Sequence, residues 1–234
     1  MKRFFVTPLI LLASLLLGQA GCVKSRADRQ SAPFVQEELD ACLAIAIDTS
    51  GSFSDYWDDR AYQLFIDLSE SFFSETMGND TRLIISQLSG SDEVILFEGR
   101  PNELQKQFPS PESLSEFLQS KSDPSQSRVF DGTTATINHL QSLSGITSRT
   151  QMLTVILSDM QDSEPDVGKR RQRGAVMVDA LKRYRESGGG LALYYVATED
   201  TERWEKILEM AGFESGHYII ANELSLSPQL PTFD

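Results

Sequence analysis

The chain has few of the residues that build disulfide frameworks, zinc sites and nucleic-acid-binding surfaces. Its 234 residues include two cysteines and two histidines. Two cysteines cannot form a disulfide scaffold, and neither histidine has a zinc-type partner at ligand spacing. Only 21 basic side chains stand against 34 acidic ones, which gives a formal net charge of −13. Such a surface repels phosphates, which argues against general nucleic-acid binding, and it attracts cations.

The signatures of several enzyme classes are also missing. The sequence contains no Gly-x-Ser-x-Gly nucleophile elbow and no Gly-x-x-x-x-Gly-Lys-[Ser/Thr] phosphate loop. No repeat of 20–50 residues is visible. Charged residues make up 24% and hydrophobic residues 40% of the chain. This balance is typical of a folded chain, and the length suffices for one domain with a sizeable core.

The N-terminal segment has the layout of a secretory signal peptide. Lys2 and Arg3 give it a positive start, and the apolar run over 9–17 is too short to span a bilayer comfortably as a permanent helix. Small residues follow this run, as expected before a cleavage site. We therefore expect residues 1–21 to be a signal peptide, with an uncleaved N-terminal anchor as the alternative.

The four residues Gln19-Ala20-Gly21-Cys22 resemble a bacterial lipobox, in which the cysteine is acylated and becomes the new N-terminus. Lipoboxes favour Leu three residues before the cysteine, where this chain has Gln19. The resemblance implies a lipoprotein of the bacterial cell envelope, anchored to the membrane by lipid at Cys22 on the extracytoplasmic side. Cys42 would then be a small buried hydrophobe. A Cys22–Cys42 disulfide is the alternative if Cys22 is not lipidated.

Residues 22–39 consist of Cys22 and the segment 23–39, which is polar and without periodicity and therefore predicts a tether. Residues 40–222 then alternate short apolar runs with amphipathic segments of helix length. The 83–88 and 93–97 runs are joined by four residues, which predicts an antiparallel hairpin. The remaining predicted strands are 42–47, 152–157, 191–196 and 217–220, and the clearest predicted helices are 56–75, 167–186 and 201–210.

Two segments have weaker patterns. Residues 98–130 are rich in Ser, Pro and Gln, and Leu114, Phe117 and Leu118 suggest one short helix inside them. A further helix is expected to begin near Thr134. The tail over 223–234 contains two prolines and is expected to be loosely ordered.

Alternating strands and helices, with continuously apolar strands, predict a doubly wound α/β fold. Its sheet would be mostly parallel, with helices on both faces. In such sheets ligands bind beyond the carboxyl ends of the strands. The residues that directly follow each predicted strand are therefore the candidates for a functional site.

Three of these positions carry oxygen-bearing side chains. Asp48-Thr49-Ser50-Gly51-Ser52 follows the first strand, Ser158-Asp159 follows the 152–157 strand, and Asp131-Gly132-Thr133-Thr134 lies at an expected helix start. Each segment alone also fits a loop or a helix cap. Together they offer carboxylates and hydroxyls without sulfur or imidazole, a ligand set that suits Mg²⁺, with Mn²⁺ or Ca²⁺ possible.

Asp48, Ser50, Ser52, Thr134 and Asp159, in this order, resemble the metal-ion-dependent adhesion site of the von Willebrand factor A (VWA) family. Thr133 competes for the threonine position, but the aliphatic residue that the family places six positions later is Leu140, which favours Thr134. The family often has Gly directly after the distant Asp, where this chain has Met160. The resemblance covers about 40–221, nearly all of the expected domain.

The resemblance implies a three-layer, Rossmann-like VWA fold with about six strands and one antiparallel edge strand. It also implies that the two serines bind the metal directly and that an open coordination position takes a carboxylate from a partner protein. The domain would then be a binding module and not an enzyme. Two alternatives stay open: a metal-dependent phosphoesterase on a similar sheet, and a structural subunit with a degenerate metal site.

One basic run stands out in this acidic chain, Lys169-Arg170-Arg171-Gln172-Arg173. Such a run is usually a solvated helix face. It is also suited to contact with anionic headgroups or with an acidic partner.

Overall fold

The computed structural model describes residues 38–50, 59–75, 80–90, 92–123, 125–222 and 229–233. The predicted signal peptide, Cys22, most of the predicted tether and Ser52 lie outside these ranges. All of the described residues belong to one unit of the chain, Gln36–Asp234. No helix in the described ranges is long and apolar enough to cross a membrane.

The fold is built on a six-stranded sheet with the order β3-β2-β1-β4-β5-β6. Only β3, at one edge, is antiparallel to its neighbour, which confirms the predicted hairpin and the mostly parallel sheet. The strands are β1 (Ala41–Ile47), β2 (Thr81–Gln87), β3 (Ile95–Gly99), β4 (Gln151–Leu157), β5 (Gly190–Tyr194) and β6 (Tyr218–Ala221).

The two central strands, β1 and β4, pair in parallel over their whole length, from Ala41 opposite Gln151 to Ile47 opposite Leu157. Both strands therefore end at the same level. We call this end of the sheet its carboxyl edge. Every residue of β1 is buried, because helices cover both faces of the sheet, and this explains its unbroken apolar sequence.

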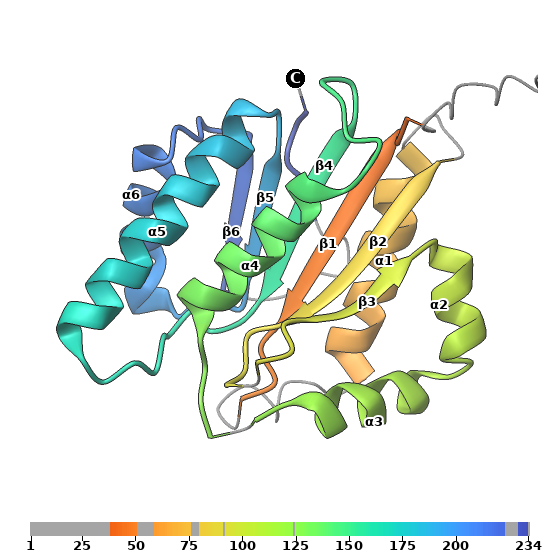
Figure 1. The fold of residues 1–234 in the computed structure, drawn as a ribbon, viewed down its shortest axis with the longest axis horizontal. Coiled ribbons are helices and arrows are strands. Elements are labelled where there is room, and N and C mark those ends of the chain that lie inside the picture. The colour runs from red at the N-terminus through yellow and green to blue at the C-terminus, as the bar shows by residue number, and fades with distance from the viewer. Residues whose placement is uncertain are drawn as a thin grey trace, which may run out of the picture. The chain divides into compact units, whose positions relative to one another are not determined.

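Six helices form the two outer layers (Figure 1). Residues from α1 (Asp59–Glu75), α2 (Pro101–Gln107) and α3 (Pro111–Lys121) share one apolar core with one face of the sheet. Those of α4 (Val129–Ser142), α5 (Val167–Glu186) and α6 (Thr201–Met210) share a second core with the other face. A short 3₁₀ helix, Thr198–Asp200, precedes α6. The three-layer α/β fold expected from the sequence is therefore confirmed.

The residues of β1 divide between the two cores according to the period of two in a strand. Leu43 and Ile45 pack with the side of α1, whereas Cys42, Ala44 and Ala46 face α4, α5 and α6. The small side chains on this second face allow close helix packing. Cys42 is a buried free thiol, as expected.

The prediction of one short helix within residues 98–130 was wrong. This segment contains two helices, α2 and α3, and not one. Each begins with a proline, Pro101 or Pro111, at the first helical position, where a missing N–H costs nothing. The local signal for both helix starts was thus present in the sequence.

The helix expected from Thr134 begins five residues earlier, at Val129. Its first amide groups are satisfied by distant parts of the chain. The N–H of Arg128 donates to the carbonyl of Leu88, and the N–H of Phe130 donates to the Asp162 carboxylate at 3.1 Å. Because these partners are not local, the residues around Val129 do not show the usual capping pattern.

The described part of the C-terminal tail, 229–233, packs against the domain and is not loosely ordered. The Tyr194 hydroxyl donates to the carbonyl of Gln229 at 2.7 Å, and the N–H of Thr232 donates to the carbonyl of Gly216 at 2.8 Å. The ring of Phe233 lies 5.8 Å from that of Phe72, centre to centre.

Candidate metal centre

Asp48 is the first residue after β1 and lies at the carboxyl edge between the two central strands. Its N–H donates to the carbonyl of Leu157, the last residue of β4, at 2.9 Å. The order of strands along the chain reverses between β1 and β4, and the crevice at such a point is the usual ligand site of open α/β sheets. The Asp48 side chain is fully buried there.

Three groups from three loops surround the Asp48 carboxylate. The hydroxyls of Ser127 and Ser158 donate to Oδ2 at 2.9 and 2.8 Å, and the N–H of Ser50 donates to Oδ1 at 3.0 Å. Ser50, Ser127 and Ser158 are all buried. The structure thus brings Asp48 and Ser50 together, as expected, with two further serines.

Ser127 is held in place from both sides. On one side it forms an isolated bridge with Ser89, which follows β2. On the other side its N–H donates to the Ser163 hydroxyl at 2.9 Å, and the N–H of Ser163 donates back to the Ser127 carbonyl at 2.9 Å. Ser127, two residues before the start of α4 at Val129, is therefore fixed between the loops that follow β2 and β4.

The loop after β4 turns sharply at Met160, which has a φ of 65°. This is the left-handed region that glycine adopts most easily. The VWA family, which this segment resembles, often has Gly at this position. In this chain the N–H of Met160 donates to the Ser158 hydroxyl at 2.9 Å. Met160 therefore keeps the glycine-like turn while burying its side chain in the core.

Asp159 lies beside Ser158 at the same edge and is half-buried. Its Oδ1 accepts a hydrogen bond of 2.9 Å from the N–H of Gln161, two residues later. This contact holds the carboxylate on the loop that follows β4, one residue beyond the position of Asp48 in the neighbouring strand.

The two threonines considered for the site both lie inside α4. The Thr134 hydroxyl donates to the carbonyl of Phe130 at 2.7 Å, within its own helix. Thr133 is buried, and its hydroxyl has no hydrogen-bond partner in the described chain. Thr134 is five residues beyond the start of α4 at Val129, or about 7 Å along the helix axis. The structure brings Ser127, and neither threonine, to hydrogen-bond distance of Asp48.

Two further residues of the expected segments are Asp131 and Ser52. Asp131, which opens the Asp-Gly-Thr-Thr segment, forms an ion pair with Arg173 of α5 at 3.1 Å. Ser52 lies outside the described residues, so its place at the site stays a prediction.

The donors at this edge fit a hard divalent cation. Asp48 has no basic ion-pair partner in the described part of the chain. Burying a charge is costly unless it is paired or hydrogen-bonded, and here only the three hydrogen bonds offset that cost. Two of the groups that contact it are hydroxyls, and the Asp159 carboxylate lies on the loop after the neighbouring strand; both are oxygen ligands of the kind that Mg²⁺, Mn²⁺ and Ca²⁺ prefer. The described ranges contain no cluster of three or more His, Cys, Asp and Glu, so any metal here would depend on serine oxygens.

Ser127 was not among the residues expected at the site. Ser158 was expected at the carboxyl edge as part of the Ser158-Asp159 segment, but only Asp159 was assigned as a ligand. Ser127 precedes Val129 and Phe130, which continue the helical spacing of Ile137 and Leu140 backwards. That spacing was the available signal for an earlier start of α4.

No protein-family model and no curated protein sequence matches the chain. Several solved structures have a similar fold. The PilB minor pilin from Streptococcus sanguinis superposes with a TM-score of 0.51 at 12% identity, over 81% of this chain and 59% of that one. The manganese-loaded TRAP protein of Plasmodium vivax gives 0.50 at 12% identity, over 80% and 69%.

Proximal thread matrix protein 1 from the mussel byssus gives a TM-score of 0.47 at 12% identity, over 80% of this chain and 45% of that one. The chain thus spans less than two thirds of the length of the pilin and the matrix protein. At these identities the likeness shows the fold alone. The chain shares the mixed α/β fold of the pilin and TRAP structures, and its own sheet has six strands with one antiparallel edge strand.

Proposed function

We propose that this chain is a VWA-type binding module that holds one divalent cation at the carboxyl edge and uses it to bind a carboxylate of a partner protein. The observation that carries the proposal is the buried Asp48 carboxylate between β1 and β4. Oxygen and N–H donors from three loops converge on it.

The cation would be held by Asp48, Ser50, Ser52 and Asp159, with Ser127 in the role expected of Thr134. Mg²⁺ suits this oxygen set, and Mn²⁺ or Ca²⁺ would be accepted. The manganese in the TRAP structure of the same fold supports a divalent ion. When bound, the ion supplies the positive charge that the described surroundings of Asp48 lack.

Binding of the partner should depend on the cation. Serine hydroxyls carry no charge. An ion that binds them directly, and at least one of the two carboxylates only through water, keeps net positive character and attracts a carboxylate. The chain itself has a formal net charge of −13 and repels acidic partners elsewhere on its surface. A chelator should therefore release the partner.

The resemblance of residues 19–22 to a lipobox supports a location at the membrane. We propose that the chain is a lipoprotein of the bacterial cell envelope, anchored through Cys22. Metabolic labelling with a palmitate analogue in a bacterial host tests this, because the label should be lost in Cys22→Ser and retained in Cys42→Ser.

Thermal unfolding with increasing Mg²⁺ or Mn²⁺ tests cation binding, since a ligand of the folded state raises the unfolding midpoint. The wild-type midpoint should rise, whereas those of Asp48→Asn and Asp159→Asn should not. Asp179→Asn is the matched control, because it removes an exposed carboxylate on α5 and should leave the rise unchanged. Asp159 is half-buried, so its variant remains informative if Asp48→Asn does not fold.

Two other outcomes would favour the alternatives. A wild-type midpoint that ignores both cations contradicts the proposal and favours a structural subunit with a degenerate site. Metal-dependent turnover of a generic phosphatase substrate, lost in Asp48→Asn, favours a phosphoesterase.

A further inference from the structure

A groove runs between α5 and α6, on the layer that contains α4. Its volume is about 510 Å³. Its apolar lining comes from both helices, and we call it the α5–α6 groove. The lining side chains used below are Val167, Ala175 and Val178 of α5 and Ile207 and Met210 of α6.

The groove exposes apolar side chains that a folded protein normally covers. Val167 is 59% exposed and Met210 is 61% exposed. Only one other large hydrophobic side chain in the described ranges, Val176, is comparably exposed. Gly174 and Ala175 have little or no side chain, so the groove stays open where they line α5.

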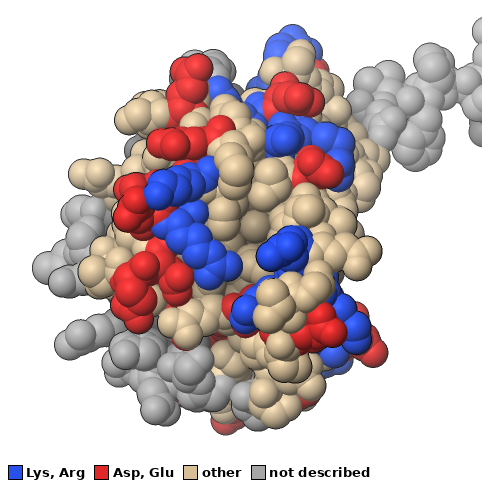
Figure 2. Space-filling view, turned by 90° about the vertical axis from the view of Figure 1, so that its left-hand side faces the viewer, with Lys and Arg blue, Asp and Glu red and all other residues tan. Residues whose placement is uncertain are grey.

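The charged residues that line the same groove are three arginines, Arg170, Arg171 and Arg203, and one acidic residue, Asp179, so its rim is basic on balance. Arg203 pairs with Asp200 at 3.4 Å, but Arg170 and Arg171 have no ion-pair partner in the described chain. The nearby Arg173, by contrast, pairs with acidic residues of its own chain. Figure 2 shows this face, with uncharged surface in a hollow between basic side chains.

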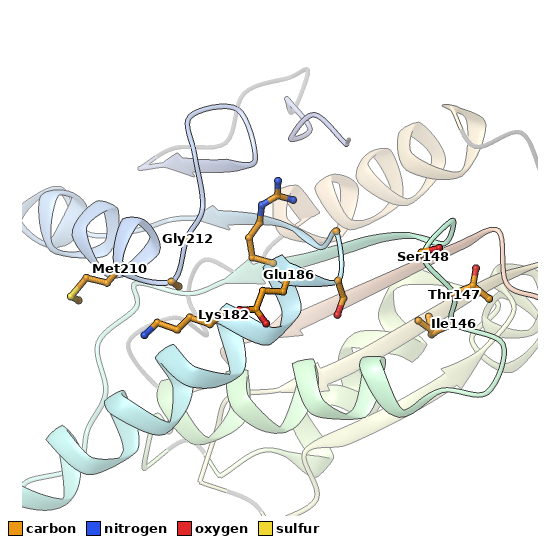
Figure 3. Close-up of a pocket in the computed structure, with 11 residues that line it drawn as sticks. Ile146, Thr147, Ser148, Lys182, Glu186, Met210 and Gly212 are labelled. Carbon is orange, nitrogen blue, oxygen red and sulfur yellow. The ribbon is translucent and has the colours of Figure 1, made fainter.

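A second pocket, of about 960 Å³, shares Met210 with the groove (Figure 3). Lys182 and Arg185 of α5 line this pocket, together with the residues that end α6 and the loop before β4. From Arg171 to Glu186, most of the α5 residues that line the two pockets have another lining residue three or four positions away, which places them on one side of the helix. This part of α5 is about 23 Å long.

We propose that the α5–α6 groove docks an amphipathic helix of a partner protein, with aliphatic side chains on one face and acidic side chains flanking them. Aliphatic side chains at spacings of three and four would fill the apolar floor, in the usual mode of a helix in a groove. Acidic flanks would meet Arg170 and Arg171, whose charges have no partner in the described chain. Because acidic side chains complement these two arginines, we expect the partner helix to be acidic.

Two other occupants fit less well. A flat bilayer does not fill a groove between helices, and an anionic membrane would also face the exposed Glu205 and Glu209 of α6, which repel it. The chain's own segment 23–37 carries three basic and two acidic residues, so its charge does not complement the rim.

Selection from a displayed library of random 16-residue peptides against the full chain tests the proposal. EDTA is present throughout, so failure at the metal centre cannot affect the result. Enriched peptides should have net negative charge and aliphatic residues at helical spacing. A fluorescein-labelled copy of the most enriched peptide should then bind with a fluorescence-polarisation signal.

Two variants should weaken that peptide's binding by about tenfold or more: the double variant Arg170→Glu/Arg171→Glu, and Ala175→Phe, which fills the groove. The control is Lys169→Glu, which makes one such charge reversal on the same helix turn but outside the lining, and it should leave binding unchanged. Far-ultraviolet circular dichroism confirms that each variant is folded.

Three results would overturn the proposal. One is that no peptide is enriched, or that enriched peptides are not acidic. Another is that a folded Arg170→Glu/Arg171→Glu variant binds them as tightly as wild type. A third is sedimentation with phosphatidylglycerol vesicles that this double variant abolishes, which would assign the surface to a membrane.

Discussion

Ser127 and Asp48 are 79 positions apart in the chain, yet the Ser127 hydroxyl donates a hydrogen bond of 2.9 Å to Oδ2 of Asp48. Both residues are buried. The bond joins a residue two positions before α4 to the residue after β1, at the point where the strand order reverses. It brings the Ser127 hydroxyl to the candidate metal centre from a distant part of the chain, and no threonine hydroxyl of α4 makes the same contact with Asp48.

Replacing Ser127 by Ala should weaken both stability and cation binding. The variant leaves a buried carboxylate oxygen with one donor fewer, which costs about 2 kcal/mol of unfolding free energy. Loss of a group that orients a metal ligand should also lower Mn²⁺ affinity by about tenfold or more. Urea unfolding and calorimetric Mn²⁺ titration measure the two effects.

Thr134→Ala is the matched control, because it also removes one hydroxyl. That hydroxyl bonds only to the carbonyl of Phe130 in the same helix, so stability should change by less than about 1 kcal/mol. Mn²⁺ affinity should not change. A large loss of affinity in Thr134→Ala, with none in Ser127→Ala, would restore the original interpretation of the sequence.

The consecutive glycines after α5 should respond differently to substitution by alanine. A Cβ on Gly189 would fall on the Tyr184 ring, which is fully buried and fixed by hydrogen bonds of 3.1 Å to Thr154 and Gly190. We expect Gly189→Ala to cost about 3 kcal/mol of unfolding free energy. Urea unfolding measures this cost.

Gly188→Ala serves as the comparison in that measurement. Gly188 has a φ of 85°, but a Cβ there would meet no atom within 4 Å. Only the backbone strain remains, at about 1 kcal/mol. Equal losses in the two variants would contradict the steric account of Gly189.

The protein should lose stability at alkaline pH because it buries neutral acids. Burial raises the pKa of the Cys42 thiol from 9.0 to about 12 and that of the Tyr194 hydroxyl from 10.0 to about 12. The unfolded chain therefore releases these protons first as the pH rises. The stability they contribute is fully present below pH 9 and is lost as the pH approaches 12.

The free energy of unfolding, measured in urea at pH 8, 9.5 and 11, should fall over this series. Cys42→Ala removes one of the groups, so its decline should be smaller than that of the wild type. An identical decline would show that the thiol does not contribute.

The strands could be predicted because their signal is local. β1, β4 and β5 are continuous apolar runs, and their burial on both faces requires that composition. The antiparallel direction of β3 followed from the short connection to β2. The bounds of α5 were predicted correctly because its cap, Asp166, and the glycines after it are local signals.

The site was only partly predictable. The positions of Asp48 and Asp159 followed from strand ends, which are local. Ser127 was missed because hydrogen bonds from Arg128 to Leu88 and from Phe130 to Asp162 determine the start of α4, and these pairs are 32 to 40 residues apart. Within α4, the helical spacing of Val129 and Phe130 with Ile137 and Leu140 indicates the earlier start, but it does not identify these distant partners.

Crystals of the full chain soaked in Mn²⁺ test the central claim most directly, because the anomalous signal of manganese locates the ion independently of any assumed ligands. The account predicts one strong peak at the carboxyl edge, in contact with oxygens of Asp48, Ser50 or Asp159 and lost in Asp48→Asn crystals. At saturating Mn²⁺, no peak at that edge, or an equal peak in Asp48→Asn, would contradict it.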